Sequence, residues 1–415
     1  MQERTISPFA RPFYIMAKPA GAACNLACRY CYYLEKSRLY ADDSRHMMSD
    51  EMLERFTKEY IEAQATSDVL FTWHGGETLL RPIAFYEKAI ALQRRYGRGR
   101  NIDNAVQTNG TLIDERWARF FADNGWLVGV SIDGPEAFHD EYRRSRQGEG
   151  SFARVMQGIE ILNRYGVQWN AMAVVNNDNG SRPLEFYRFF KSIGCHYLQF
   201  TPVVERALGH ADGRSLAAPD EESMAVTAFS VGAEQWGDFL CAVFDEWVRT
   251  DVGDYFVQLF DATLANWVGV APGICSMAPT CGQVGVMEYN GDVYSCDHFV
   301  FPEYRLGNIR DESLYALMHG DRQRAFGAAK RETLPRQCRE CEYLFACNGE
   351  CPKNRFSVTA DGDSGLNYLC RGYKKFFHHV APYMDFMANE LRHDRAPANV
   401  MEAIRRGWIG TEDNV

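Results

Sequence analysis

The chain lacks any run of about 18 apolar residues, the length that a membrane-spanning helix needs. The amino-terminal segment also lacks the continuous apolar core of a signal peptide, because Arg4, Pro8, Arg11 and Pro12 interrupt it. Internal repeats and low-complexity segments are absent as well. These absences predict a cytoplasmic protein without a membrane partner.

Positive charge is scarce relative to negative charge. The 45 Lys and Arg residues are outnumbered by 55 Asp and Glu residues, so the net charge is −10. This balance argues against a nucleic-acid partner, since binding to the phosphate backbone depends on clustered basic residues. No G-x-G-x-x-G follows the first predicted strand, so a Rossmann nucleotide site is unsupported. The remaining composition is that of an ordinary globular protein of one large domain or two.

Cysteine, in contrast, is plentiful. The chain has 13 cysteines, most of them in closely spaced groups, which in an unexported protein indicate metal or clusters more than disulfides. The first group, Cys24, Cys28 and Cys31, has the spacing C-x3-C-x2-C, so one tight loop can aim three sulfurs at a common point. A structural zinc takes four ligands, and the next candidate, His46, is 15 residues beyond Cys31. Three ligands on a four-iron cluster would leave one iron open, although core cysteines or half a zinc site also fit this spacing.

Six strand–helix units follow one another in the first half of the chain. The predicted strands cover residues 13–17, 69–73, 104–107, 126–133, 167–175 and 197–204, and the predicted helices cover 50–64, 82–96, 114–124, 151–165, 183–193 and 234–249. Near-continuous apolar strands that alternate with helices indicate a parallel sheet covered by helices. Parallel barrels place their chemistry at the carboxyl ends of the strands, and the first cysteine group follows the first strand.

Glycines and polar residues follow the other predicted strands. The second strand runs into His74-Gly75-Gly76-Glu77-Thr78, the third ends at Gln107-Thr108-Asn109-Gly110, and the fourth at Ser131-Ile132-Asp133-Gly134-Pro135. Arg143, in the next segment, could clamp a carboxylate with two parallel hydrogen bonds. Each of these residues could equally be an ordinary loop residue.

The second half of the chain carries eight further clustered cysteines: Cys275, Cys281, Cys296, Cys338, Cys341, Cys347, Cys351 and Cys370. Alternating runs around Asn290-Gly291 predict a β-hairpin, and the later cysteines follow the pattern C-x2-C-x5-C-x3-C. The spacings alone permit two zinc sites with four cysteines each. Cys195 and Cys241 lie in apolar elements and are expected to be small core residues.

These motifs resemble those of the radical S-adenosylmethionine (SAM) superfamily. The likeness rests on C-x3-C-x2-C with Tyr30 before its last cysteine, on the Gly75-Gly76-Glu77 motif, and on the later cysteines, which resemble the family's SPASM extension. Thr78 stands where the family often has proline. The segments DVYSCDHFVFPEYRLGNI, CNGECPKNRF and APYMDFM resemble the anaerobic sulfatase-maturating enzymes, and the likeness covers about residues 12–390.

The resemblance implies an α/β fold with two domains. A partial (β/α)6 TIM-like radical SAM barrel would cover residues 12–252. A small cysteine-rich SPASM domain with two iron–sulfur clusters and a C-terminal helix would cover residues 253–392. The predicted helix at 366–392 contains Pro382, which is expected to break it, and its His378 and His379 point in different directions, which favours a structural role over a metal site.

The resemblance also implies three [4Fe–4S] clusters and bound SAM. Cys24, Cys28 and Cys31 would hold the cluster with the open iron. Cys275, Cys281, Cys296 and Cys351 would hold the first auxiliary cluster, and Cys338, Cys341, Cys347 and Cys370 the second. SAM would contact Tyr30, Gly75, Gly76, Glu77, Gln107, Ser131 and Arg143, with Arg143 on its methionine carboxylate.

The implied reaction is the oxidation of a Cys or Ser of a sulfatase polypeptide to Cα-formylglycine. A 5′-deoxyadenosyl radical would remove a Cβ hydrogen, Asp297 would act as the base, and an auxiliary cluster would take the second electron. An external one-electron reductant, such as flavodoxin or ferredoxin, would be a partner. Without the resemblance, a turn-capping role would be preferred for Asp297. Two alternatives stay open: another SPASM enzyme that forms thioethers or crosslinks in peptides, and a non-catalytic zinc or electron-transfer protein.

Overall fold

The computed structural model describes residues 12–40, 46–207 and 225–409, and its contacts divide the chain into two compact units. The first unit comprises Met1–Ser131, Asp140–Trp169 and Cys281–Ala328, and the second comprises Ile132–His139, Asn170–Thr280 and Ala329–Val415. Both units combine early and late segments of the sequence. The predicted domain boundary at residues 252 and 253 stays a prediction.

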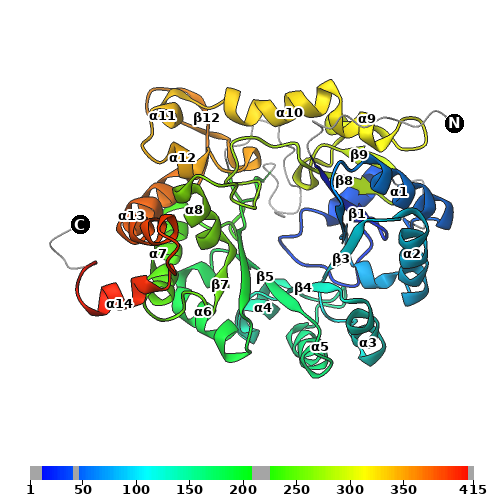
Figure 1. The fold of residues 1–415 in the computed structure, drawn as a ribbon, viewed down its shortest axis with the longest axis horizontal. Coiled ribbons are helices and arrows are strands. Elements are labelled where there is room, and N and C mark those ends of the chain that lie inside the picture. Colours follow the sequence, from blue (N-terminus) through cyan, green and yellow to red (C-terminus); the bar gives the residue numbers. More distant parts are fainter. Residues whose placement is uncertain (1–11, 41–45, 208–224, 410–415) are drawn as a thin grey trace. The chain divides into compact units, whose positions relative to one another are not determined.

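The first strand of the chain lies in the middle of the first unit's sheet (Figure 1). On one side of it the strands are parallel and follow chain order: β1 (Tyr14–Lys18), β2 (Asp68–Trp73), β3 (Asn101–Thr108) and β4 (Leu127–Ser131). On the other side lies a parallel strand followed by two antiparallel ones: β8 (Val284–Glu288), β9 (Asp292–Tyr294) and β10 (Arg305–Asn308). The carboxyl ends of β1 to β4 therefore meet at one edge.

Helices of the first unit pack through apolar faces. They are α1 (Asp50–Ala63), α2 (Ile83–Tyr96), α3 (Glu115–Asn124), α5 (Phe152–Arg164) and α9 (Leu314–His319), with the short turns η1 (Leu34–Tyr40), η2 (Thr78–Leu80), η4 (Asp297–Phe299) and η5 (Pro302–Tyr304). Helix α4 (Glu136–Tyr142) and helix α10 (Asp321–Glu332) run across the boundaries between the units. Ser49 caps α1 by accepting a hydrogen bond from the Met52 N–H at 3.1 Å. The ring of Phe56 stacks on Tyr60 and meets Phe71 edge-on, which joins α1 to β2.

The second unit contains three parallel strands and a group of helices. Its strands are β5 (Trp169–Val175), β6 (Tyr197–Pro202) and β7 (Phe256–Val257), with a separate hairpin of β11 (Ser357–Val358) and β12 (Ser364–Leu366). Its helical elements are η3 (Asn179–Ser181), α6 (Pro183–Ser192), α7 (Ala233–Thr250), α8 (Gln258–Val268), α11 (Arg336–Arg339), α12 (Leu344–Cys347), η6 (Pro352–Asn354), α13 (Cys370–Arg392) and α14 (Asn399–Arg405). All six predicted strand–helix units are present, with ends within about three residues of the prediction.

The expected break at Pro382 is wrong. Helix α13 continues through Pro382 to Arg392, although a proline inside a helix costs about 3 kcal/mol. Packing against α7 offsets that cost, because the two helices touch at Gly237 and Gly372, where an added Cβ on Gly372 would lie 2.1 Å from the Ala233 carbonyl oxygen. The buried face of α13 includes Phe376, Phe377, Val380, Tyr383, Met384 and Met387.

Two other local predictions are confirmed. β8 and β9 form the antiparallel hairpin predicted around Asn290-Gly291, with Gly291 at a φ of +92°. The adjacent histidines have separate structural partners, since His378 contacts the Tyr343 hydroxyl and His379 the Asp245 carboxylate. None of the helices in the described ranges is long and apolar enough to cross a membrane.

Candidate functional site

The loop that carries Cys24, Cys28 and Cys31 leaves the carboxyl end of β1 through a series of tight turns. The Gly21 N–H donates to the Lys18 carbonyl at 3.1 Å, and the Cys31 N–H donates to the Cys28 carbonyl at 3.1 Å. Electrostatic interaction between the Cys24 and Cys31 thiols indicates that they lie near one another. All 13 cysteines lie in the described ranges and none forms a disulfide. These soft, unbridged donors fit an iron–sulfur cluster.

Burial raises the pKa of the Cys24 thiol to about 11, and the nearby Glu77 carboxylate adds to the increase. A thiol in this environment is protonated at neutral pH. Cluster binding must therefore displace its proton, because thiolate is the form that ligates metal. The sulfur of Cys24 accepts hydrogen bonds from the Leu26 N–H at 3.4 Å and from Asn109 Nδ2 at 3.7 Å, which help to stabilise that form.

A segment of the first unit around Arg143 holds the cysteine loop through hydrogen bonds. The Ala27 N–H donates to the Arg144 carbonyl at 2.8 Å, and Arg146 Nε donates to the Cys24 carbonyl at 3.1 Å. Arg143 itself is largely buried, and its guanidinium carbon lies 5.5 Å from the centre of the Tyr30 ring. The cation–π contact joins two of the residues predicted to bind SAM.

The Gly75-Gly76-Glu77 segment after β2 packs directly on the cysteine loop. The Gly76 N–H donates to the Gly21 carbonyl at 2.8 Å, and the Glu77 N–H donates to the Ala23 carbonyl at 2.7 Å. Only glycine fits at position 76, because an added Cβ would lie 2.2 Å from the Ala23 carbonyl oxygen.

The Glu77 carboxylate is buried and already has three donors. Its oxygens accept from the Leu79 N–H at 2.9 Å, the Thr108 hydroxyl at 2.7 Å and the Asn109 N–H at 2.8 Å. It therefore holds the ends of β2 and β3 together. Contact of Glu77 with SAM stays a prediction, as does contact with Gly75.

The ends of β3 and β4 bring two further predicted residues into contact. Gln107 Nε2 donates to the Ser131 hydroxyl at 2.9 Å. Both side chains are partly exposed at the edge where the cysteine loop begins. Polar groups that could bind SAM thus lie at the carboxyl ends of three neighbouring strands, as expected for parallel α/β folds.

Asp297, just after β9, lies in a network of buried polar side chains. Lys18 Nζ is 2.5 Å from Asp297 Oδ1, and the Tyr32 hydroxyl donates to Asp297 Oδ2. Lys18 also donates to His74 Nδ1 at 3.1 Å, and the Gly75 N–H donates to the same nitrogen at 2.8 Å. Because Nδ1 accepts both bonds, His74 is neutral and carries its proton on Nε2.

The charges in this network reinforce one another. Burial alone would raise the pKa of Asp297, but the Lys18 ammonium lowers it well below its usual value. Burial lowers the pKa of His74 to about 3, and Lys18 contributes to the decrease. At neutral pH the group therefore consists of a carboxylate, an ammonium and a neutral imidazole. Removing either member of a buried ion pair costs about 3–5 kcal/mol.

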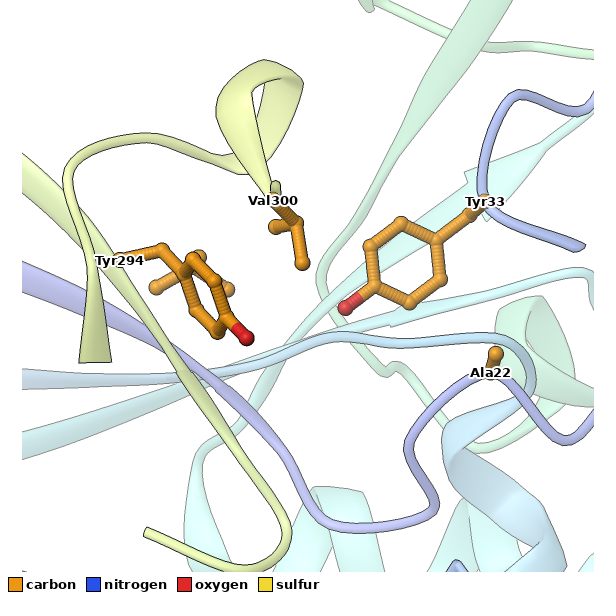
Figure 2. Packing of buried hydrophobic residues seen from close by; sticks show 5 residues of the cluster. Ala22, Tyr33, Tyr294 and Val300 are labelled. Atoms are coloured by element: carbon orange, nitrogen blue, oxygen red, sulfur yellow. The ribbon is translucent and has the colours of Figure 1, made fainter. Parts of the chain in front are cut away.

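A second carboxylate lies close to this network. The Tyr33 hydroxyl donates to Glu288 Oε1, and burial raises the pKa of Glu288 to about 7. Figure 2 shows Tyr33 and Tyr294 on opposite sides of Val300 in an apolar cluster that also includes Ala22. Cys31 and Tyr32 pack against the same cluster, so the positions of the loop and of the Asp297 network are fixed by one core.

Four cysteines of the second unit also form a group. Burial raises the pKa values of Cys338, Cys347 and Cys370, and neighbouring thiols of the group, which also includes Cys341, raise them further. Burial raises the pKa of Cys347 to about 12 and that of Cys370 to about 11. These four suit one cluster with four thiolates.

The other predicted auxiliary set is distributed differently. Cys275 and Cys351 belong to the second unit, whereas Cys281 and Cys296 belong to the first. Their assignment to one cluster stays a prediction.

Comparisons with known proteins agree with this arrangement. A model of the radical SAM superfamily matches residues 19–190, and a model of the SPASM iron–sulfur cluster-binding domain matches residues 281–342. The chain is 61% identical to the serine-type anaerobic sulfatase-maturating enzyme of Bacteroides thetaiotaomicron, over 99% of this chain and 100% of that protein. The chain belongs to the anaerobic sulfatase-maturating enzymes.

More distant members of the family are similar over nearly the same length. The serine-type enzyme of Klebsiella aerogenes is 34% identical over 96% of this chain and 91% of its own. A solved structure described as native anSMEcpe with bound AdoMet and Cp18Cys peptide is 31% identical, with a TM-score of 0.80, over 92% of this chain and 100% of that one. The predicted fold class, a partial (β/α)6 radical SAM barrel with a SPASM region, is confirmed, and this sulfatase-maturating enzyme is a radical SAM oxidoreductase.

Sequence reasoning missed the residues that surround Asp297. Lys18, Tyr32 and His74 were not singled out, although two of them carried a signal. Lys18 is a charged residue at the end of an otherwise apolar strand, and it is fully buried in the enzyme. His74 directly precedes the glycine motif. A buried charge of this kind requires a partner, which Asp297 supplies.

Proposed function

We propose that the enzyme oxidises a serine of a sulfatase polypeptide to Cα-formylglycine. The preference for serine over cysteine rests on the Bacteroides relative, whose name is serine-type and which is 61% identical, whereas the cysteine-type enzyme of Clostridium perfringens is 32% identical. The observation that carries the proposal is the buried carboxylate of Asp297, which directly follows Cys296, a cysteine predicted to bind a cluster, and is held by Lys18 and Tyr32.

Three clusters and SAM are part of the proposal. Cys24, Cys28 and Cys31 would hold the cluster with the open iron, and the eight later cysteines would hold two auxiliary clusters. Bound SAM and the first cluster supply a 5′-deoxyadenosyl radical when an external reductant, such as flavodoxin or ferredoxin, provides one electron. Tyr30, Gly75, Gly76, Glu77, Gln107, Ser131 and Arg143 remain the proposed SAM contacts.

The hydrogens and electrons that serine loses in the reaction define the role of Asp297. Conversion of a serine CH2OH group to an aldehyde removes two hydrogens and two electrons. One hydrogen atom leaves from Cβ to the deoxyadenosyl carbon, and the hydroxyl proton and the remaining electron must follow. Asp297 takes the proton, and an auxiliary cluster, when bound, would take the electron. With a cysteine target, water would add to the thioaldehyde and hydrogen sulfide would leave.

The low pKa of Asp297 keeps its side chain ionised, which is the form that can accept a proton. An alcohol is a poor acid, so a weakly basic carboxylate leaves the serine hydroxyl intact in the ground state. A hydroxyl beside a carbon radical is far more acidic, so the same carboxylate can accept its proton after the hydrogen atom has left. Lys18 keeps Asp297 ionised until then, because an uncompensated buried carboxylate would be protonated.

The test is anaerobic incubation with SAM, a reductant and a serine-containing sulfatase peptide, with the peptide analysed by mass spectrometry. Loss of two hydrogens from the serine is expected, and any other mass change, such as a crosslink, would refute the proposed product. Asp297→Asn should retain iron and the cleavage of SAM yet form product at least about 100-fold more slowly. Glu303→Gln, which alters an exposed carboxylate on the same segment, is the matched control and should react like the unmodified enzyme.

A further inference from the structure

The loop between Cys347 and Cys351 has an unusual backbone. Asn348, Gly349 and Glu350 are consecutive residues with positive φ angles of 48°, 71° and 53°. Residues other than glycine rarely adopt this left-handed conformation, which costs them about 1–2 kcal/mol each. Such strain persists only where the surrounding structure enforces it, so the loop must be held by specific contacts.

Arg355 supplies these contacts. Its guanidinium donates to the carbonyls of Asn348 at 2.9 Å, Gly349 at 2.8 Å and Glu350 at 3.2 Å, and also to the Lys330 carbonyl at 2.5 Å. An added Cβ at Gly349 would lie 2.4 Å from Arg355 Nη2, so the arginine can bind the loop only because position 349 is glycine. The side chain of Glu350 is directed inward by this fixed turn and is 4% exposed.

The groups that hydrogen-bond to the Glu350 carboxylate are all N–H donors. Asn354 Nδ2 lies 3.0 Å and Asn367 Nδ2 lies 2.6 Å from Glu350 Oε2, and the Cys351 backbone N–H donates to the same carboxylate. A protonated acid would have to donate to an acceptor, whereas an ionised carboxylate only accepts. The donor set therefore fits a buried negative charge held by neutral groups, without a direct ion pair.

This charge lies among the proposed ligands of both auxiliary clusters. Glu350 is between Cys347, assigned to one cluster, and Cys351, assigned to the other. Burial raises the pKa of the Cys347 and Cys275 thiols, and the Glu350 carboxylate raises both further. Its field thus reaches sulfurs from the two sets.

A buried cation opposes this field. Lys330 is 1% exposed and donates to the carbonyls of Cys275 at 2.7 Å and Ser276 at 2.8 Å. Burial raises the pKa values of Glu350 and Cys275, and the Lys330 charge counteracts part of this increase. The segment therefore contains one fixed charge of each sign close to the same cysteines.

We propose that Glu350 is a positioning residue whose held negative charge makes the auxiliary clusters harder to reduce, and that Lys330 opposes it. The inference rests on the proposed function, because it assumes that these cysteines bind clusters. Cluster potentials depend on nearby charge, and a reduced cluster carries additional negative charge. Glu350 would thus favour passage of the substrate electron onward from the auxiliary clusters over its retention there.

The test is a redox titration of the full-length, cluster-loaded enzyme followed by electron paramagnetic resonance. Glu350→Gln removes the charge. At a fixed applied potential it should raise the ratio of reduced to oxidised auxiliary cluster about tenfold, which corresponds to a reduction potential about 59 mV higher for a one-electron couple. Lys330→Gln should shift the ratio the opposite way. Glu342→Gln, an exposed glutamate beside Cys341, is the matched control and should leave the ratio unchanged because solvent screens its charge.

The possible outcomes separate this inference from the function on which it rests. A loaded Glu350→Gln enzyme without a shift, or a shift of equal sign in Glu350→Gln and Lys330→Gln, would overturn the inference and leave the proposed function intact. If Glu350→Gln fails to retain iron, Lys330→Gln decides, since a shift toward oxidised supports the inference and no shift overturns it. An unmodified enzyme with about four irons in place of about 12 would refute the proposed clusters and the inference together.

Discussion

Gly76 offers a direct test of how the glycine motif supports the cysteine loop. In Gly76→Ala the added Cβ would lie 2.2 Å from the Ala23 carbonyl oxygen and 2.7 Å from two backbone atoms of Ala22. Contacts under 3.0 Å are essentially never seen for a Cβ, so the two loops must separate by at least about 0.8 Å. All three obstructing atoms are backbone, so a change of rotamer cannot relieve the overlap.

The separation removes two hydrogen bonds, from the Gly76 N–H to Gly21 and from the Glu77 N–H to Ala23. At about 1 kcal/mol each, with the overlap added, the variant should lose roughly 2–4 kcal/mol of stability. Cys24 directly follows Ala23, so binding of the first cluster should fail while the auxiliary clusters remain. Iron analysis after anaerobic reconstitution should therefore fall by about four irons per chain, with SAM cleavage abolished.

Gly232→Ala is the control for this experiment, because its added Cβ would meet only Gln235 at 3.9 Å. It should retain all iron and cleave SAM normally. A Gly76→Ala enzyme that kept its full iron content and its SAM cleavage would show that the two loops do not depend on this close contact, and the assignment of the motif to the site would have to be revised.

Two further predictions concern stability. Because the pKa of His74 falls from 6.5 to about 3 on folding, the unfolded chain binds more protons at this residue than the folded chain between these values, so the contribution of His74 to stability rises with pH across that window. Between pH 7.5 and pH 5.5 the unmodified enzyme should therefore lose about 1.4 kcal/mol relative to His74→Gln in denaturant titrations, because the opposite contribution of Glu288, whose pKa is raised to about 7, is common to both. The exposed control His393→Gln should follow the unmodified enzyme. Pro382→Ala should stabilise the enzyme by about 1–2 kcal/mol, because the exposed ring of Pro382 contributes little packing and alanine restores a helical N–H; an unchanged or lower denaturation midpoint would contradict this.

The strand–helix order of the first half could be predicted because each element signals itself locally. β2 is a short apolar run, and α3 is bounded by Asp114, which caps its first turn, and by Gly125 at a φ of +64°. The spacing of Cys24, Cys28 and Cys31 predicts a metal-binding loop for the same reason, since all three lie on one short segment. Where local chemistry determines the structure, pattern and spacing are sufficient.

The residues that depend on pairing between distant segments could not be predicted in this way. The hairpin of β8 and β9 was evident from Asn290-Gly291, but nothing in its sequence indicates that β8 lies parallel to β1. That pairing brings Asp297 to Lys18, so the ion pair could not be predicted from the sequence, although Asp297 was a candidate base. Pro382 shows the opposite error, because a strong local signal was overridden by packing on α7.

Two buried carboxylates next to cluster cysteines are held in contrasting ways, and the contrast matches their proposed tasks. Asp297 faces the Lys18 ammonium at 2.5 Å, so the pair is nearly neutral as a whole and Asp297 stays ionised until it accepts a proton. Glu350 is held by the amides of Asn354 and Asn367, which stabilise its charge without cancelling it. A group that must be ionised before it accepts a proton benefits from a counter-charge close by. A group that must keep a constant field at a redox centre benefits from neutral donors, because its charge then remains uncompensated at short range.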